Sequence, residues 1–145
     1  MRPMTDYSAI PAAGSIPIAT VTGDPVVRVA ATATVADVAQ AIVHGEVGAV
    51  VVGVDERPTA LVSERDVVAV VADGRDPAAV PAAEVASTNL IWCDAETTVD
   101  EAAVRMMNHY IRHILVERSG VLIGIVSARD LLGVYGADAR TNPLP

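Results

Sequence analysis

Two Ser-x-x-Asp pairs are the residues of this chain best suited to hold a small ligand. Ser63 with Asp66 forms the first pair, and Ser127 with Asp130 forms the second, 64 positions later. A serine at the start of a helix offers its hydroxyl beside free backbone amides, an arrangement that binds phosphate. A carboxylate on the same turn accepts the two hydrogen bonds of a vicinal diol such as that of ribose. Each pair therefore has the parts of a nucleotide site.

The same spacing also describes a helix cap, in which the serine and the acidic residue satisfy each other's backbone amides. Two features favour a ligand. The acidic partner in such a cap is usually Glu or Gln, whereas both copies have Asp. In addition, Arg65 and Arg129 place a cation near a helix N-terminus, which is unfavourable unless an anion is bound there. Both interpretations stay open at this point.

The two pairs belong to an internal repeat. Residues 60–66 (ALVSERD) recur as residues 124–130 (GIVSARD), and the same shift superposes residues 34–35 on residues 98–99 without a gap. Self-similarity of this kind is the signature of a tandem repeat. Because one copy of about 60 residues buries too little apolar surface to be stable alone, the two copies are expected to share a core. Paired clefts between the copies are then the expected place of function.

Hydrophobic periodicity predicts the order β-α-β-β-α in each copy. The fold class is therefore α/β (α+β), with two such repeats packed with pseudo-two-fold symmetry. The expected strands are residues 26–29, 49–54, 59–62, 91–93, 114–117 and 121–126. The expected helices are residues 34–44, 63–74, 98–108 and 127–136, with Gly45 as the stop of the first.

Proline and glycine positions divide the chain into five segments. The predicted organisation is an N-terminal arm (1–16), repeat 1 (17–76), a connector (77–83), repeat 2 (84–136) and a flexible tail (137–145). The arm is interrupted by prolines and lacks the unbroken apolar run of a signal peptide. The longest apolar runs are too short to span a bilayer, so we expect a cytoplasmic protein with no membrane partner.

The composition excludes several classes of function. A formal net charge of −8 without a Lys/Arg block makes nucleic acid an unlikely partner, because cations must neutralise its phosphates. Cys93 is the only cysteine and the three histidines are scattered, so neither a disulfide framework nor a metal site is expected. No Ser-His-Asp order, Cys-His pair or phosphate-loop motif is present, and we therefore expect a protein that is not an enzyme.

The repeat order, residues 111–116 (IRHILV) and residues 124–131 (GIVSARDL) together resemble a tandem pair of CBS domains, also called a Bateman module. The resemblance covers residues 17–136. It implies two pseudo-symmetric clefts that bind adenine nucleotides or related adenosyl ligands. In this family the Ser/Thr and Asp of one repeat hold phosphate and ribose, while the other repeat flanks the base.

The resemblance assigns site residues to both clefts. In the favoured cleft they are Thr22, Val27, Val47, Gly48, Arg112, Ile125, Ser127, Arg129 and Asp130. In the second cleft they are Leu61, Ser63, Arg65, Asp66, Ala86, Ile91, Ile111 and His113. Arg112 is expected to face the second cleft as well. His113 by itself is more simply interpreted as a structural residue that enters a buried strand.

Differences between the copies favour the cleft that contains Asp130. Its predicted phosphate cation, Arg112, corresponds to Gly48 in the other copy, and its base-side hydroxyl, Thr22, corresponds to Ala86. The glycine that precedes the Ser-x-x-Asp strand is Gly124 in the second copy and alanine in the first.

The leading hypothesis is a regulatory sensor that binds AMP, ADP or ATP, requires no cofactor, and signals to an effector protein that the sequence does not identify. Exposed apolar helix faces predict a C2 homodimer. Two alternatives remain: a ligand-free interaction module in which the Ser-x-x-Asp pairs are only helix caps, and a binder of S-adenosylmethionine or NAD.

Overall fold

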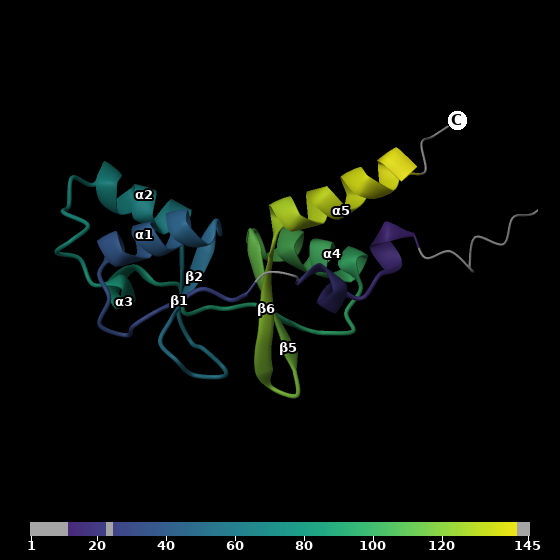
Figure 1. The fold of residues 1–145 in the computed structure, drawn as a ribbon, viewed down its shortest axis with the longest axis horizontal. Coiled ribbons are helices and arrows are strands. Elements are labelled where there is room, and N and C mark those ends of the chain that lie inside the picture. Colours follow the sequence, from purple (N-terminus) through teal and green to yellow (C-terminus); the bar gives the residue numbers. More distant parts are fainter. Residues whose placement is uncertain (1–11, 23–24, 142–145) are drawn as a thin grey trace, which may run out of the picture.

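The computed structural model describes residues 12–22 and 25–141, which form two similar halves side by side (Figure 1). The first half contains β1 (Arg28–Val29), α1 (Val35–Gly45), β2 (Ala49–Val52), β3 (Leu61–Ser63) and α2 (Glu64–Ala72). A short helix, α3 (Ala82–Val85), follows in the connection. The second half contains β4 (Trp92–Asp94), α4 (Val99–His109), β5 (His113–Arg118), β6 (Val121–Ser127) and α5 (Ala128–Thr141). Two short 3-10 helices, η2 (Ala13–Ser15) and η3 (Ile18–Val21), precede them.

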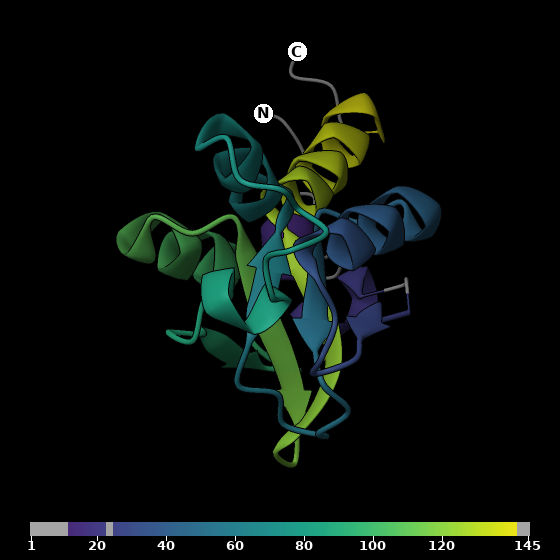
Figure 2. The ribbon, with the colours of Figure 1, turned by 90° about the vertical axis from the view of Figure 1, so that its left-hand side faces the viewer.

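Both halves have the predicted β-α-β-β-α order and the same sheet topology. The strand orders are β1-β2-β3 and β4-β5-β6, and in each sheet the first pair is parallel and the second antiparallel. Ala49 pairs with Ser63 in the first sheet, and His113 pairs with Ser127 in the second. These two pairs are related by the shift of 64 positions, so the repeat in the sequence is also a repeat in space. Helices α1, α2, α4 and α5 lie on one side of the sheets (Figures 1 and 2).

The two sheets share a core, as the size of one repeat predicts. Ala49, Val51 and Leu61 from the first half form one buried cluster with Leu115 and Leu122 from the second half. β2 is built from Ala and Val alone and has three of its four residues buried, which a continuous apolar run predicts for a central strand. The connections of one half also contact the other half: the backbone N–H of Leu122 donates to the carbonyl of Glu56 at 2.9 Å.

The segment that precedes each repeat in the sequence packs on the other repeat. Ile18 is fully buried in the core of the second half, and its N–H donates to the carbonyl of Thr97 at 2.7 Å. In the same way, Ala82 is buried in the first half, and the N–H of Val35 donates to the carbonyl of Val80 at 2.8 Å. The first residues that the sequence assigns to repeat 1 therefore belong structurally to the second half.

The end of the first long helix corrects one sequence prediction. Gly45 is the last helical residue, and the left-handed residue that ends the helix is Glu46, with φ 52°. Gly45 has a packing role instead, because a Cβ atom there would lie 2.8 Å from Cγ2 of Val27. Tyr110, at the equivalent place after α4, has φ 54°, so both helices end in the same way.

The end of the last helix, α5, also differs from its prediction. The sequence places its end at Gly136 and a flexible tail from residue 137, whereas α5 continues to Thr141. Gly136 keeps a negative φ, and the residues that follow it include two alanines, the best helix formers, which offset the cost of glycine. β1 also differs from its prediction, since only two of the four expected residues pair in the sheet. Most of the predicted N-terminal arm and residues 142–145 lie outside the described residues.

Candidate ligand-binding clefts

The Ser-x-x-Asp pairs are capping boxes in the structure. The backbone N–H of Ser127 donates to Oδ2 of Asp130 at 2.8 Å, and the N–H of Asp130 donates to Oγ of Ser127 at 3.0 Å. Ser63 and Asp66 make the same reciprocal pair, at 2.8 and 3.4 Å. The expectation that an aspartate favours a ligand over a cap was wrong, because aspartate also reaches the cap amide.

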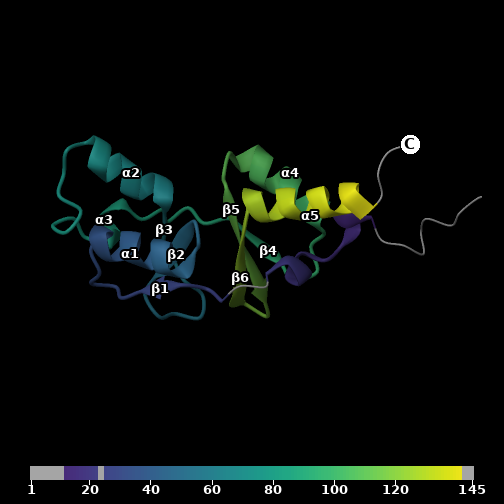
Figure 3. The same ribbon diagram turned by 45° about the horizontal axis from the view of Figure 1, so that its top comes forward.

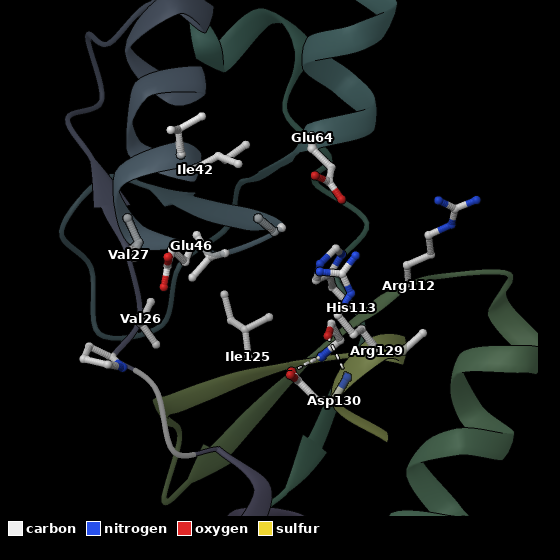
Figure 4. A pocket seen from close by; sticks show the side chains of 17 residues that line it. Val26, Val27, Ile42, Glu46, Glu64, Arg112, His113, Ile125, Arg129 and Asp130 are labelled. Atoms are coloured by element: carbon white, nitrogen blue, oxygen red, sulfur yellow. Dashed lines mark hydrogen bonds between the residues drawn. The ribbon is translucent and has the colours of Figure 1, made fainter. Parts of the chain in front are cut away.

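Capping does not use up either carboxylate. Each box uses only Oδ2, and in the part of the chain that the structure describes, Oδ1 of Asp66 and Oδ1 of Asp130 accept no hydrogen bond. Asp130 lines a cavity at the start of α5 (Figure 4). The cap therefore holds the side chain in a fixed rotamer and leaves an acceptor for a ligand.

The first cleft lies between the halves and has a volume of about 580 Å³. Eight of the nine residues predicted for the favoured cleft line it: Val27, Val47, Gly48, Arg112, Ile125, Ser127, Arg129 and Asp130. The wall from the first half is mainly aliphatic but includes the carboxylates of Glu46 and Glu64, whereas the wall from the second half carries the hydroxyl of Ser127, the carboxylate of Asp130 and both arginines (Figure 4). Such a division suits an amphipathic ligand with one apolar and one anionic end.

Thr22 is the predicted residue that does not line the first cleft. Its hydroxyl donates to the carbonyl of Ala19 at 2.8 Å. Its side chain packs against β6, because a Cβ atom on Gly124 would lie 2.5 Å from Cβ of Thr22. The glycine before the second Ser-x-x-Asp pair is thus explained by the close approach of Thr22, and not by ligand contact.

The second cleft is smaller, with a volume of about 200 Å³. Seven of the eight predicted residues line it: Leu61, Ser63, Arg65, Asp66, Ile91, Ile111 and His113. Ala86 does not, because it packs with the apolar core of the first half. Its neighbour Ser87 lines the cleft instead and exchanges two backbone hydrogen bonds with Leu61, at 3.0 and 2.8 Å.

Sequence reasoning missed part of both linings. In the first cleft the additional residues are Pro25, Val26, Ile42, Val43, Glu46, Ala49, Glu64, His113 and Ala128. In the second they are Glu64, Ser87, Asn89, Leu90, Tyr110 and Leu115, while Arg112, which the resemblance places at both clefts, lines both. Ile42 and Val43 lie on the apolar face of α1 that the periodicity identifies, so a signal for them existed. No comparable signal exists for Glu64, whose side chain crosses between the halves.

His113 lies where the halves meet. Its Nε2 atom is 3.0 Å from the position that a Cβ atom would take on Gly48. Burial lowers the pKa of His113 below its ordinary value, and Arg112 acts in the same direction, whereas the carboxylates of Glu64, Asp130 and Asp66 raise it. Since burial is the largest of these effects, the imidazole is neutral near pH 7.

Among residues 12–22 and 25–141, no group of three His, Cys, Asp or Glu side chains could hold a metal ion, and no helix has the length and hydropathy of a membrane span. Cys93 is buried beneath α4, and burial raises the pKa of its thiol. The two clefts are thus the features that point to a ligand.

Comparison with protein families agrees with the fold and the repeat. The CBS domain model matches the chain twice, at residues 18–73 and 82–137. The chain belongs to the CBS-domain family. The two matches follow one another along the chain, and each contains the strands and all or most of the long helices of one half, so this is a tandem CBS pair.

Three known proteins illustrate the relationship. Over 93 residues, 63% of this CBS pair, it is 36% identical to an uncharacterized protein of Methanopyrus kandleri, and it spans only 47% of that protein's length. It is 30% identical over 100 residues to Hypoxic response protein 1 of Mycobacterium tuberculosis, covering 68% of this chain and 70% of the relative. A CBS domain protein of Pyrobaculum aerophilum, solved in complex with AMP, superposes with a TM-score of 0.72 and 31% identity, over 84% of this chain and 99% of that one.

Proposed function

We propose that this CBS pair is a regulatory module that binds an adenine nucleotide in the first cleft. The observation that carries the proposal is the junction of β6 and α5. There a helix N-terminus, the free Oδ1 of Asp130 and the guanidinium of Arg129 line one cavity with an apolar wall. The hydroxyl of Ser127 and the guanidinium of Arg129 suit phosphate, and the carboxylate suits a ribose diol.

The opposite wall suits the base. Val27 directly precedes β1, Ile42 lies in α1 and Val47 lies in the turn between α1 and β2, and all three line the cavity with aliphatic side chains. A purine bound between them and Ile125 would be buried without an aromatic partner, in keeping with a chain that has no Phe. A volume of about 580 Å³ lies within the range of small-molecule sites. The AMP bound by the Pyrobaculum relative supports the same ligand class.

Regulation follows from the position of the cleft between the halves. A ligand that contacts both halves stabilises one relative arrangement of them and thereby changes the surface presented to a partner. The outer faces of the long helices carry exposed apolar side chains, among them Met107 on α4 (73% exposed) and Leu132 on α5 (71% exposed). Figure 3 shows the course of α4 and α5 with the top of Figure 1 turned forward. We propose that these outer faces bind a second copy of the chain or an effector protein, and sedimentation at micromolar concentration tests the homodimer.

A thermal-shift and calorimetric titration with AMP, ADP, ATP, NAD and S-adenosylmethionine tests the ligand. A ligand at about 100 times its Kd raises the free energy of unfolding by about 2.7 kcal/mol. We expect AMP to stabilise the wild-type protein and Asp130→Asn to abolish most of that shift. Asp37→Asn is the matched control, because Asp37 closes the same type of capping box with Thr34 but lines neither cleft.

The control separates the loss of a cap from the loss of a ligand contact. If none of the five ligands stabilises the wild type, the chain is better described as a ligand-free interaction module. If S-adenosylmethionine alone stabilises it, the regulatory ligand is a phosphate-free adenosyl compound. If Asp130→Asn binds AMP as tightly as Asp37→Asn does, the first cleft is not the nucleotide site.

A further inference from the structure

Three side chains line both clefts: Glu64, Arg112 and His113. Each has a counterpart 64 positions away in the other repeat, and the counterparts are Ala128, Gly48 and Ala49. Every large residue at the boundary between the clefts therefore corresponds to an alanine or a glycine. The three small residues line the first cleft only.

This pairing is a packing requirement. A Cβ atom on Gly48 would lie 3.0 Å from Nε2 of His113 and 3.7 Å from Oε1 of Glu64, so the large side chains occupy the space that the small ones leave. Two symmetric sets of large residues would overlap there, because a filled interior tolerates little added volume. The clefts are consequently separated by a single set of side chains, and this set lines both of them. The small set also leaves room in the first cleft, in keeping with its larger volume, about 580 against about 200 Å³.

The shared set includes a cation that both clefts need. The cationic side chains of the first cleft are Arg112 and Arg129, and those of the second are Arg65 and Arg112. Glu64, also shared, gives both clefts a negative charge that opposes an anionic ligand. If Arg112 turns to a phosphate in one cleft, the other keeps Glu64 and loses half of its cationic charge.

Arg112 has the freedom to serve either cleft. Its side chain is exposed, and in the described part of the chain no hydrogen bond or ion pair holds its guanidinium. In Figure 4 it extends away from Asp130, so it must turn to contact a phosphate bound at the start of α5. Its backbone is fixed, because its carbonyl accepts the N–H of Ala128 at 2.9 Å. A fixed backbone with a free side chain allows a switch between two positions.

We propose that the two clefts bind anionic nucleotides antagonistically through Arg112, so that each chain holds one phosphate-bearing ligand at a time. This inference rests on the proposed function. By linkage, a nucleotide in the first cleft weakens binding in the second by the same factor that a nucleotide in the second weakens binding in the first.

Calorimetric titration with AMP tests the antagonism in the full chain. The variants are Asp66→Asn, which alters only the second cleft, Asp130→Asn, which alters only the first, and the double variant. We expect one AMP per chain for the wild type, at an affinity that Asp66→Asn leaves unchanged or improves. Asp130→Asn should reveal one weaker site per chain, which the wild type masks, and the double variant should bind no AMP.

Arg112→Gln tests whether the guanidinium is the shared group. A hydrogen bond to a charged group is worth about a tenfold change in affinity. Arg112→Gln should therefore weaken AMP binding about tenfold in the Asp66→Asn background and also in the Asp130→Asn background. Arg118→Gln is the control for a lost surface charge, since Arg118 lines neither cleft.

Three results overturn the inference. Two AMP molecules bound per wild-type chain, at the affinities of the single-cleft variants, would show independent sites. No binding by Asp130→Asn would show that the second cleft does not compete, and an effect of Arg112→Gln in only one background would show that the cation is not shared. Failure of the wild type to bind AMP at all would instead refute the proposed function and the inference with it.

Discussion

The two clefts are built on one backbone plan and differ in the side chains placed on it. The N–H of Glu64 donates to the carbonyl of Gly48 at 2.9 Å, and the N–H of Ala128 donates to the carbonyl of Arg112 at the same distance. These equivalent bonds start α2 and α5. On this common frame one cleft is large and the other small, because at each of three boundary positions one repeat carries a large residue and the other repeat a small one. The two repeats share a backbone arrangement, and the differing side chains at the boundary make the first cleft the larger candidate site for a ligand.

The largest expected effect concerns the segments that precede each repeat. Ile18 and Ala82 occupy equivalent positions, and both are fully buried. Ile18→Ala places in the second half the residue type that Ala82 has in the first half. The substitution leaves a cavity, because the core of the second half is packed around isoleucine. We expect a loss of about 2 to 5 kcal/mol in the free energy of unfolding, measured by urea denaturation. A loss below about 1 kcal/mol would show that Ile18 does not hold this segment on the second half.

A smaller effect is expected where Thr22 approaches β6. Gly124→Ala places a Cβ atom 2.5 Å from Cβ of Thr22, whereas the equivalent residue of the first repeat is already Ala60. We expect a destabilisation of about 1 to 3 kcal/mol by the same measurement, which is typical of overpacking. Adding Thr22→Gly to this variant should restore part of the stability. Equal stability of Gly124→Ala and the wild type would mean that the contact relaxes freely.

The folding pattern could largely be predicted from the sequence, because each element carries a local signal. Continuous Val runs identify the central strands, and Thr34 and Thr98 identify helix starts that the structure confirms as capping boxes. The end of α5 could not be predicted from Gly136, because a glycine ends a helix when its φ angle is positive, and Gly136 does not have a positive φ. That angle depends on the surrounding packing and not on the residue type alone.

The candidate site was predictable in part for the same reason. Residues on the motif itself, such as Ser127 and Asp130, line the cleft because the motif starts a helix at its edge. Glu64 was missed, and His113 was assigned to one cleft although it lines both, because a linear alignment of repeats does not show which side chains cross between them. Thr22 was assigned wrongly to the lining, because its contact with Gly124 depends on how segments distant in sequence are folded together.

His113 adds a titratable group to the boundary between the clefts, where its counterpart in the first repeat is Ala49. We therefore expect this position to make stability depend on pH. Burial lowers the pKa of His113 in the folded chain, and Arg112 adds to this effect, against the opposing carboxylates of Glu64, Asp130 and Asp66. The unfolded chain therefore binds the proton more readily. The stability that the neutral imidazole contributes is complete above its unfolded pKa, about 6.5, and is lost as the pH falls towards the folded pKa.

His113→Gln removes this contribution and serves as the reference. We expect the free energy of unfolding of the wild type to fall more steeply than that of His113→Gln as the pH is lowered from about 8 to about 5. Glu64→Gln should lower the pKa of His113 further and widen the range over which stability is lost. Parallel pH profiles for the wild type and His113→Gln would contradict the burial of a neutral imidazole at the boundary.

The smallest effect is expected at Cys93, which is equivalent to Val29 in the first strand of the other half. Both side chains pack into apolar clusters, and Cys93 makes no disulfide. Cys93→Val copies the first repeat with little change of volume, so the free energy of unfolding should change by less than about 1.5 kcal/mol. Because burial raises the pKa of the thiol, Cys93 should react slowly with a thiol reagent in the folded protein and rapidly in urea. Rapid reaction in the folded state would show that the core of the second half opens around Cys93 without global unfolding.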